Sequence, residues 1–520
     1  MGQGRAHATG GKRAEPRGGR MTRRQVPALP RYRNDAVTRR LCAAAHLDER
    51  FARQVGEELS GDRMTAIGLP LGVNLVALVR HARMGARRME ARDRRLGWLF
   101  VGLWAAVVVA LYGSVDGSSV AAVAGGGAAL VVIAAAWWLV YAAESQARSA
   151  AQEVFRAGGK AEDLAPPAPP EAEARLLEMK KTNVVPYTAS AERTNPFVGS
   201  GDKIKEVVWQ PIDVSRPAEA PGGGKLAIKP FDAVDLHTYV AKEMANIAGL
   251  EGLRARNRLY VMGNHVQHLG PDLLPDPLGR PRVQIPKQLV RAGLLNPGAG
   301  MRTYLSLERV GDGGRVIVSM HLRARLQSPS LSWEVAAYGI PPVSAVYSVV
   351  DRLPIDGLER WWSLLRFATG QVWPALRGAL GRNHRRGAAR NRRARELEKW
   401  RREITKRHAI HDYGAVDSVR ERVASWNQLG HSDRMDSQDF LHRLQQGVLI
   451  ATERFLKDHN VDTSSFDQAQ QVINTQTYNF SGDVTGPSNF GNNGQIAASY
   501  GQGQPSGAPG GAAGHVGGGP

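Results

Sequence analysis

The chain carries two adjoining apolar stretches, LGWLFVGLWAAVVVALY (residues 96–112) and VAAVAGGGAALVVIAAAWWLVYAA (residues 120–143), and its only charged side chain between residues 96 and 143 is Asp116. At a rise of about 1.5 Å per residue, the stretches would span roughly 25 Å and 35 Å as helices, against a hydrocarbon core of about 30 Å. The pattern predicts a transmembrane helical hairpin. A buried hairpin in a soluble core is the alternative, but charge-free runs with arginine-rich flanks are uncommon there.

The charges beside the hairpin predict its orientation. Basic residues flank both stretches at Arg80, Arg83, Arg87, Arg88, Arg92, Arg94, Arg95, Arg148, Arg156 and Lys160. The link at residues 113–119 contains no Lys or Arg. Because basic flanks stay on the cytoplasmic side, we expect a multi-pass protein of the cell membrane with both chain ends in the cytoplasm.

Small residues recur at four-residue spacing on both stretches, where they would let the two helices approach closely in lipid. The predicted contact residues are Gly102, Ala106, Ala121, Gly125 and Ala129. Neither stretch contains an ionisable Asp, Glu, Lys, Arg or His, so nothing marks an ion or proton path. We therefore expect an anchor rather than a transporter.

The remaining composition is that of a largely soluble chain. Its 520 residues are 42% hydrophobic, too few for a polytopic membrane protein, and 68 Lys and Arg against 48 Asp and Glu leave a net charge of +20. Cys42 is the only cysteine, which excludes an intrachain disulfide and a multi-thiolate metal site and suits a reducing cytosol. The apolar stretches begin far from the amino terminus, so a cleaved signal peptide is not expected.

Further segments surround the hairpin. Residues 1–34 are basic and rich in Gly and Pro, and we expect a disordered arm there. Residues 35–95 have the apolar spacing of a cytoplasmic helical region, and residues 144–195 predict a helix followed by a Pro- and Ala-rich linker. The apolar run at residues 64–79 is interrupted by Gly and Pro, and we expect it to lie against the bilayer or a neighbouring helix.

Four short motifs carry a resemblance to known sequences: LCAAAHLD (41–48), GVNLV (72–76), NPFVGSG (195–201) and LPDPLGRP (274–281). Together with the Arg-rich flank and the double apolar stretch, they resemble uncharacterised integral membrane proteins of actinobacteria, over roughly residues 35–355. The resemblance implies a two-helix membrane hairpin and an α+β cytoplasmic domain. It transfers no biochemical activity.

Residues 196–356 predict this α+β cytoplasmic domain. Helices are expected over residues 232–253 and 287–295, and strands over residues 207–210, 258–262, 301–310, 315–326 and 332–338. The GDGG sequence at 311–314 joins two alternating runs as a hairpin turn should. We expect a mostly antiparallel sheet with helices on one face, in an α+β multi-domain chain that also contains the transmembrane hairpin.

No catalytic motif emerges from this domain. The NPFVGSG sequence lacks GxxxxGK[ST] spacing, so we expect a tight turn rather than a phosphate loop. Ser200 does not stand in a GxSxG motif, and spacing assigns it no His and Asp partners. His265, His268 and His321 lack metal-binding spacing. We therefore assign no catalytic, cofactor-binding or metal-binding residue, and expect no cofactor.

Residues 357–410 predict an amphipathic helix followed by a basic one. The first could lie in a membrane interface or pack against the sheet, and Pro374 should kink or end it. Thirteen Lys or Arg oppose three Glu over residues 377–407, which indicates an anionic partner. Anionic lipid is favoured over nucleic acid because the hairpin would hold this segment near the inner leaflet. The predicted contact residues are Arg382, Arg385, Arg386, Arg390, Arg392, Arg393, Arg395, Lys399, Arg401 and Arg402.

Residues 411–467 predict a helical segment, with an apolar stripe over residues 440–456 and a cap at Asp436 or Ser437. The stripe needs a partner, either the basic helix or a second copy of the chain. The tail at residues 468–520 is rich in Gly, Asn and Gln, and we expect it to be disordered, with β-ladders between chains as the alternative.

These features favour a membrane-anchored cytoplasmic scaffold or interaction protein of unknown partner. One alternative is a membrane enzyme whose site within residues 196–356 shows no local motif. Another is a pore-forming or stress-response effector that self-associates through the hairpin and the tail. The lack of a catalytic motif is the reason for preferring a protein that is not an enzyme.

Overall fold

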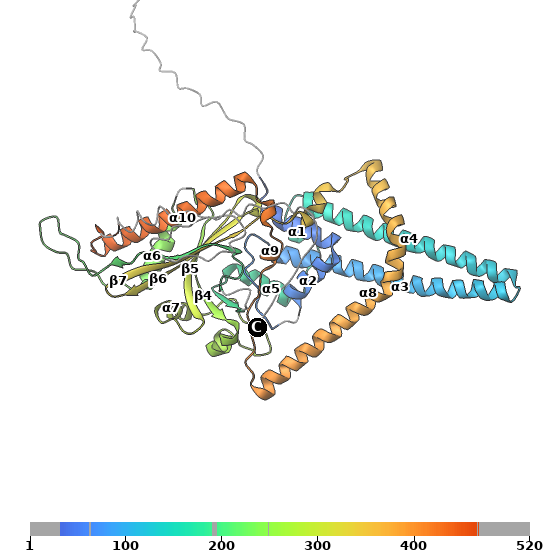
Figure 1. Ribbon diagram of the computed structural model, residues 1–520, viewed down its shortest axis with the longest axis horizontal. Coiled ribbons are helices and arrows are strands. Elements are labelled where there is room, and N and C mark those ends of the chain that lie inside the picture. Colours follow the sequence, from blue (N-terminus) through green and yellow to red (C-terminus); the bar gives the residue numbers. More distant parts are fainter. Residues whose placement is uncertain (1–31, 62–63, 190–194, 248, 465, 467–520) are drawn as a thin grey trace, which may run out of the picture. The chain divides into compact units, whose positions relative to one another are not determined.

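The computed structural model describes residues 32–61, 64–189, 195–247, 249–464 and 466, and Figure 1 shows their arrangement. The predicted tail, its β-ladders and almost all of the predicted basic arm lie outside these residues. The helices are α1 Ala36–Leu47, α2 Glu49–Ser60, α3 Leu75–Val115, α4 Ser119–Arg156, α5 Pro170–Glu178, α6 Ala233–Met244, α7 Lys287–Leu295, α8 Gly357–Arg407, α9 Val419–Arg422 and α10 His431–Asp458. The strands are β1 Val184–Tyr187, β2 Asp202–Val208, β3 Ile212–Asp213, β4 Arg254–Met262, β5 Met301–Val310, β6 Ile317–Gln327 and β7 Ser330–Ile340.

The strands form one seven-stranded sheet in the order β1-β4-β5-β6-β7-β2, and β3 also pairs with β7. All neighbours are antiparallel except β1 and β4. Four predicted strands are confirmed as β4 to β7, whereas the strand predicted over residues 207–210 overlaps only the last two residues of β2, and the short strands β1 and β3 were not predicted. The predicted helix over residues 232–253 ends at Met244, and the glycines at 249 and 252 then adopt positive φ angles that a helix does not allow.

One face of the sheet is covered by α6 and α10, which lie along it in Figure 1. The apolar stripe of α10, including Leu444, Val448 and Phe455, packs against α6 and the sheet. Neither of the partners predicted for this stripe was right. The predicted cap was also wrong: α10 begins at His431, and the backbone N–H of Gly430 donates to the Asp433 carboxylate. The stripe therefore starts more than two turns after the beginning of a longer helix.

The other face of the sheet is covered by loops and carries many polar side chains. Leu69 and Leu71 from the interrupted apolar run, together with Phe197, pack on Tyr260 and Tyr338 of the sheet. The first part of the run therefore lies against the sheet, which was not predicted, whereas its last residues, 75–79, pack against the neighbouring helices α1 and α2, as one of the two alternatives predicted. These last residues open α3, whose first turn is capped by the Asn74 side chain.

Two long helices, α3 and α4, lie side by side and form the hairpin (Figure 1). Both are long and apolar enough to cross a membrane. Residues 96–112 are the last part of α3, which starts at Leu75 and packs its first turns against α1 and α2. The helix α8 continues through Pro374, so the expected end is not observed; it changes direction where it crosses the hairpin (Figure 1).

A buried histidine, His237, predicts that the sheet loses stability in acid. His237 is fully buried, donates from Nδ1 to Asn257 Oδ1 at 3.0 Å and accepts the Ala324 backbone N–H on Nε2 at 2.9 Å. Burial lowers its pKa to about 4. Between about pH 6.5 and that value the unfolded chain binds the proton more readily, so stability is full above this window and falls as the pH drops through it.

We expect the His237→Gln variant, which cannot be protonated, to show a shallower loss of stability between about pH 6.5 and 4.5. One proton contributes a slope of up to about 1.4 kcal/mol per pH unit. Thermal unfolding of the detergent-solubilised protein across this range measures the slope. The matched control is His384→Gln at an exposed position of α8, which should keep the parent slope. Equal slopes in all three proteins would contradict the assignment.

Candidate functional site

The hairpin helices contact each other through small residues. A Cβ added to Gly125 would stand 2.4 Å from the backbone nitrogen of Ala110 and 2.8 Å from the carbonyl oxygen of Ala106. Gly113, which was not predicted, makes an equally close approach to Ala121. Of the remaining predicted contact residues, Ala129 packs partly buried against the core of the hairpin. A Cβ at Gly102 would meet nothing within 4 Å, so this glycine is not a close-contact position.

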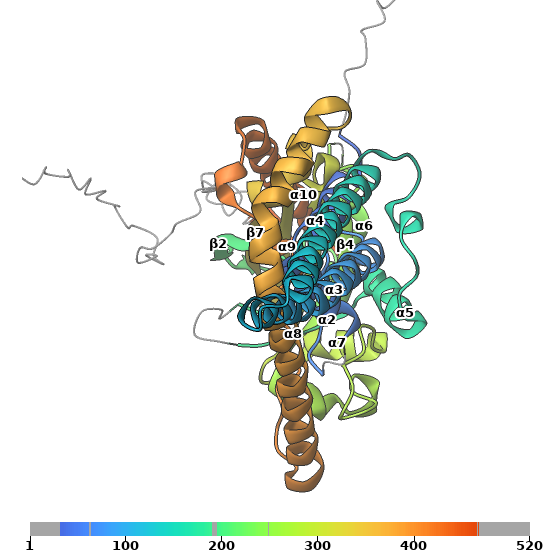
Figure 2. The same ribbon diagram turned by 90° about the vertical axis from the view of Figure 1, so that its right-hand side faces the viewer.

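The helix α8 crosses the base of the hairpin. Its Ala368, Leu376 and Ala379 pack with Leu96 and Val140 in one apolar cluster. Several hydrogen bonds accompany this packing, including those from Trp137 to Thr369, from Arg148 to Ser363 and from Asn383 to the Asp93 carbonyl. Figure 2, in which the hairpin points toward the viewer, shows α8 running across it. The amphipathic segment therefore packs against the hairpin rather than the sheet.

Beside this contact, part of the surface of α8 is apolar and exposed. Leu358, Trp362, Trp373 and Leu380 fall on one face of the helix, and each is at least 42% exposed. Trp361 beside them is also exposed. A row of tryptophans on a helix surface is typical of side chains that lie at a membrane–water boundary.

A buried carboxylate joins α8 to the hairpin. Asp93 of α3 is fully buried and forms ion pairs with Arg92 at 3.0 Å, with Arg382 at 2.8 Å and with Arg386. Arg386, 5% exposed, also pairs with Glu49 of α2 at 2.6 Å. Three helices therefore meet at one network of charge-assisted hydrogen bonds, which are stronger than neutral ones.

Two more of the predicted lipid-contact arginines have internal partners. Arg390 pairs with Glu90 at 3.3 Å, and Arg393 pairs with Glu57 at 2.7 Å. These arginines were predicted to contact an external anion. Together with Arg382 and Arg386, they instead follow one side of α8 onto carboxylates of α2 and α3, which leaves the other predicted residues as candidates for an external contact.

The remaining basic residues lie further along α8 or on its outer side. Arg392 and Arg395 are exposed and form no ion pair within the described part of the chain. Among the described residues, Arg385 donates only to the Gly381 carbonyl of its own helix. Arg402 and Lys399 pair with Glu398 and Glu403 one turn away, whereas Arg401 is partly buried.

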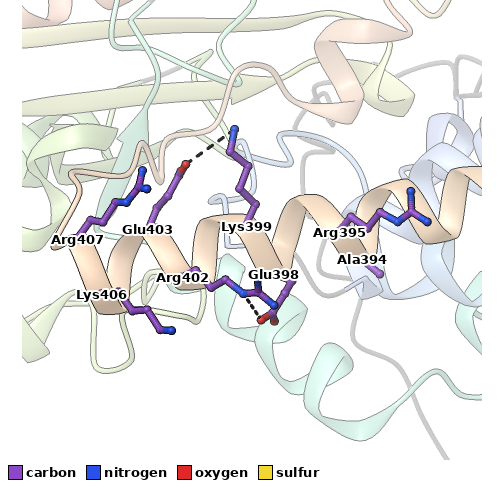
Figure 3. Close-up of a pocket in the computed structure, with 8 residues that line it drawn as sticks. All are labelled: Ala394, Arg395, Glu398, Lys399, Arg402, Glu403, Lys406 and Arg407. Atoms are coloured by element: carbon purple, nitrogen blue, oxygen red, sulfur yellow. Dashed lines mark hydrogen bonds and ion pairs between the residues drawn. The ribbon is translucent and has the colours of Figure 1, made fainter.

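A hollow of about 710 Å³ lies against the last turns of α8 (Figure 3). The residues that line it all belong to α8, and Figure 3 shows their side chains extending from different sides of the helix. A surface supplied by one helix does not enclose a small molecule as binding pockets do. This hollow is therefore an open basic surface.

Ser200 and His321 meet in the structure although 121 residues separate them. Ser200 Oγ lies 2.9 Å from His321 Nε2, and Ser306 Oγ lies 2.9 Å from Nδ1 of the same ring. Burial holds the pKa of His321 well below its usual range, with the Arg258 charge as a second cause. All three residues are fully buried, and a hydroxyl stands where an activating carboxylate would be needed. The contact holds the NPFVGSG turn on the sheet and leaves no access for a substrate.

The NPFVGSG turn itself binds a carboxylate of the chain. The backbone N–H groups of Gly199 and Gly201 donate to Glu421 Oε1 at 2.9 Å and 2.8 Å. These two glycines have positive φ angles, and a Cβ on Gly199 would collide with Leu69. The tight turn is confirmed, and Glu421 occupies the amides that a phosphate would require.

The two other histidines considered as metal ligands lie next to each other. The rings of His265 and His268 are 5.4 Å apart, and His265 Nδ1 contacts the Ala299 carbonyl oxygen at 2.7 Å. Among the residues that the structure describes, no group of three or more His, Cys, Asp or Glu side chains could hold a metal ion. His321 is part of the buried contact with Ser200 instead.

The sheet, the helices on it and the apolar hairpin define a mixed α/β protein with two helices long enough to cross a membrane. A family model for the AbeC-like domain matches residues 208–493, more than half of the chain, and the protein therefore belongs to the AbeC-like family. The match runs from the end of β2 through α10, while α1 to α4 precede it. Comparison with curated proteins found no match, and comparison with solved structures found none either.

We expect Asp93→Asn to destabilise the protein by about 3–5 kcal/mol, because the change leaves buried guanidinium groups without their carboxylate. Thermal unfolding of the full-length chain in detergent measures the loss. Asp116→Asn is the matched control, since Asp116 is an exposed aspartate at the other end of α3. An equal melting temperature for the two variants would show that the network contributes nothing to stability.

Proposed function

We propose that the protein is a membrane-anchored interaction protein whose hairpin crosses the bilayer twice and whose AbeC-like domain lies in the cytoplasm. In this arrangement both chain ends lie on the cytoplasmic side and the turn between α3 and α4 lies outside. An actinobacterial source, which the Ala-, Gly- and Arg-rich composition favours, is part of the proposal. The partner recognised by the domain is a protein or an anionic surface.

The exposed apolar surface of the hairpin carries this proposal. Trp98 and Trp104 on α3 and Val123 and Leu130 on α4 are each at least 60% exposed within the described chain. Soluble proteins seldom expose a continuous apolar patch of this kind. From Leu96, where α8 crosses, to the end of α3 is about 30 Å at 1.5 Å per residue, which equals the thickness of the hydrocarbon core.

The outer face of α8 fits the inner boundary of such a bilayer. The exposed Trp373 lies between Val372 and Leu376, which pack in one cluster with Leu96, where the apolar part of α3 begins. Indole rings favour the headgroup boundary. Arg385, exposed on the same helix two residues beyond the Asn383 contact with Asp93, supplies positive charge for anionic lipid, which contributes about 1 kcal/mol for each basic residue near the surface.

We expect the double variant Val108→Arg, Leu130→Arg to lose membrane insertion. Both side chains are exposed near the middle of the apolar part of their helices, and each arginine would cost about 2.5–3.5 kcal/mol at the bilayer centre. Carbonate-resistant membrane association of the full-length protein measures the effect.

The matched control is Val208→Arg, Val416→Arg, which places two arginines at exposed valines away from the hairpin and should leave insertion unchanged. Protease treatment of intact cells adds a test of orientation, since a carboxyl-terminal label should survive it. Recovery of the parent protein from a detergent-free supernatant would refute the anchor.

A further inference from the structure

A groove of about 290 Å³ opens between α2, α3 and α8. Its floor is made of small residues, including Ala52 and Gly56 of α2 and Ala86 of α3. A Cβ added to Gly56 would find only Arg83 Cγ, at 4.0 Å. The groove is therefore hollow because short side chains line its base, and its volume is at the lower end for small-molecule sites.

Five arginines and two glutamates line the groove. The arginines are Arg53, Arg83, Arg87, Arg386 and Arg390, and the glutamates are Glu57 and Glu90. Three helices supply these guanidinium groups, so their proximity depends on the fold and is not a property of one basic segment. Guanidinium groups bind phosphate oxygens through paired hydrogen bonds.

Two of these arginines lack an internal counter-charge. Arg53 pairs with Glu57 at 3.5 Å, while Arg386 and Arg390 have the carboxylate partners described above. Within the described residues, Arg83 donates only to Ser60 Oγ at 3.1 Å, and neither Arg83 nor Arg87 meets a carboxylate. Burial, and then the charge of Arg87, lowers the pKa of Arg83. Two neighbouring uncompensated cations favour an external anion between them.

The position of the groove along α3 indicates where the anion comes from. At about 1.5 Å per residue, Arg83 lies about 20 Å before Leu96, where the apolar part of the helix begins. The headgroup region on each side of a bilayer is only about 5–8 Å thick. A lipid headgroup would therefore not reach Arg83, whereas a free anion in the cytoplasm would.

The lining also indicates the chemical class of the ligand. It contains no Phe, Tyr, Trp or His on which a base could stack. We propose that the groove between α2, α3 and α8 binds a small soluble anion with two or more phosphoryl groups, held by Arg83 and Arg87 and supported by Arg53, Arg386 and Arg390. The choice of a soluble ligand rests on the proposed membrane crossing, whereas the groove itself does not, because all of its residues precede the apolar part of α3 or belong to α8.

Inorganic tripolyphosphate is a suitable probe for the full-length chain in detergent micelles, with binding measured by isothermal titration calorimetry. The double variant Arg83→Gln, Arg87→Gln should bind it at least about tenfold more weakly, because two charge-assisted contacts are lost. Gly56→Leu should weaken binding to a similar degree by filling the groove while leaving every charge in place. Circular dichroism verifies that both variants fold.

The matched control is Arg392→Gln, Arg395→Gln, which removes two exposed charges of α8 outside the groove and should keep the parent affinity. Equal weakening in this control, or unchanged binding in Gly56→Leu, would overturn the proposal in favour of diffuse attraction to a basic surface. Flotation with vesicles that contain phosphatidylinositol bisphosphate tests whether a lipid headgroup is the anion that the groove binds. Groove-dependent binding to these vesicles, without binding of free tripolyphosphate, would overturn a soluble ligand.

Discussion

The Asp93 carboxylate is the point on which the arrangement of helices depends. It is buried at the base of the apolar part of α3 and receives guanidinium groups from α3 itself and from α8, while Arg386 extends the network to Glu49. Burying one of these charges alone would be costly, because each would lose its hydration without gaining a partner. The network therefore specifies where α8 crosses the hairpin, and the apolar contacts of Leu376 and Ala379 with Leu96 follow from that position.

The sheet and the hairpin bury their apolar side chains in different ways. The sheet is covered on both faces: α6 and α10 cover the first, and loops bearing Leu69, Leu71 and Phe197 cover the second. The second face also contains the buried Arg258 and Glu308 pair and the His321 hydroxyl contacts. The hairpin, by contrast, has only one covered side at its base. Its remaining apolar surface is unpaired within the described chain, and lipid is the solvent that suits such a surface.

The sequence predicted the elements whose periodicity is local. The strands at residues 301–310 and 332–338, the helix at 287–295 and the turn at 195–201 required only alternation, helical spacing and glycine content. The partner of α10 and the Ser200 contact with His321 could not be predicted, since they join residues far apart and no local pattern encodes the pairing. One local pattern could have predicted the ion pairs between α8 and the neighbouring helices. Arg382, Arg386, Arg390 and Arg393 recur at helical spacing, which places them on one side of a helix and calls for a row of acids opposite.

Those acidic residues neutralise part of the positive charge of α8. The excess of basic residues in α8 suggested one uniform surface, yet the carboxylates of Glu49, Glu57, Glu90 and Asp93 neutralise one side of the helix within the fold. What remains is divided between exposed arginines on the outer side of α8 and the uncompensated pair in the groove beside it. These two surfaces differ in enclosure. An open surface suits the many weak contacts of a lipid headgroup layer, whereas a groove of limited volume suits a compact anion, so one basic segment can contribute to two kinds of recognition.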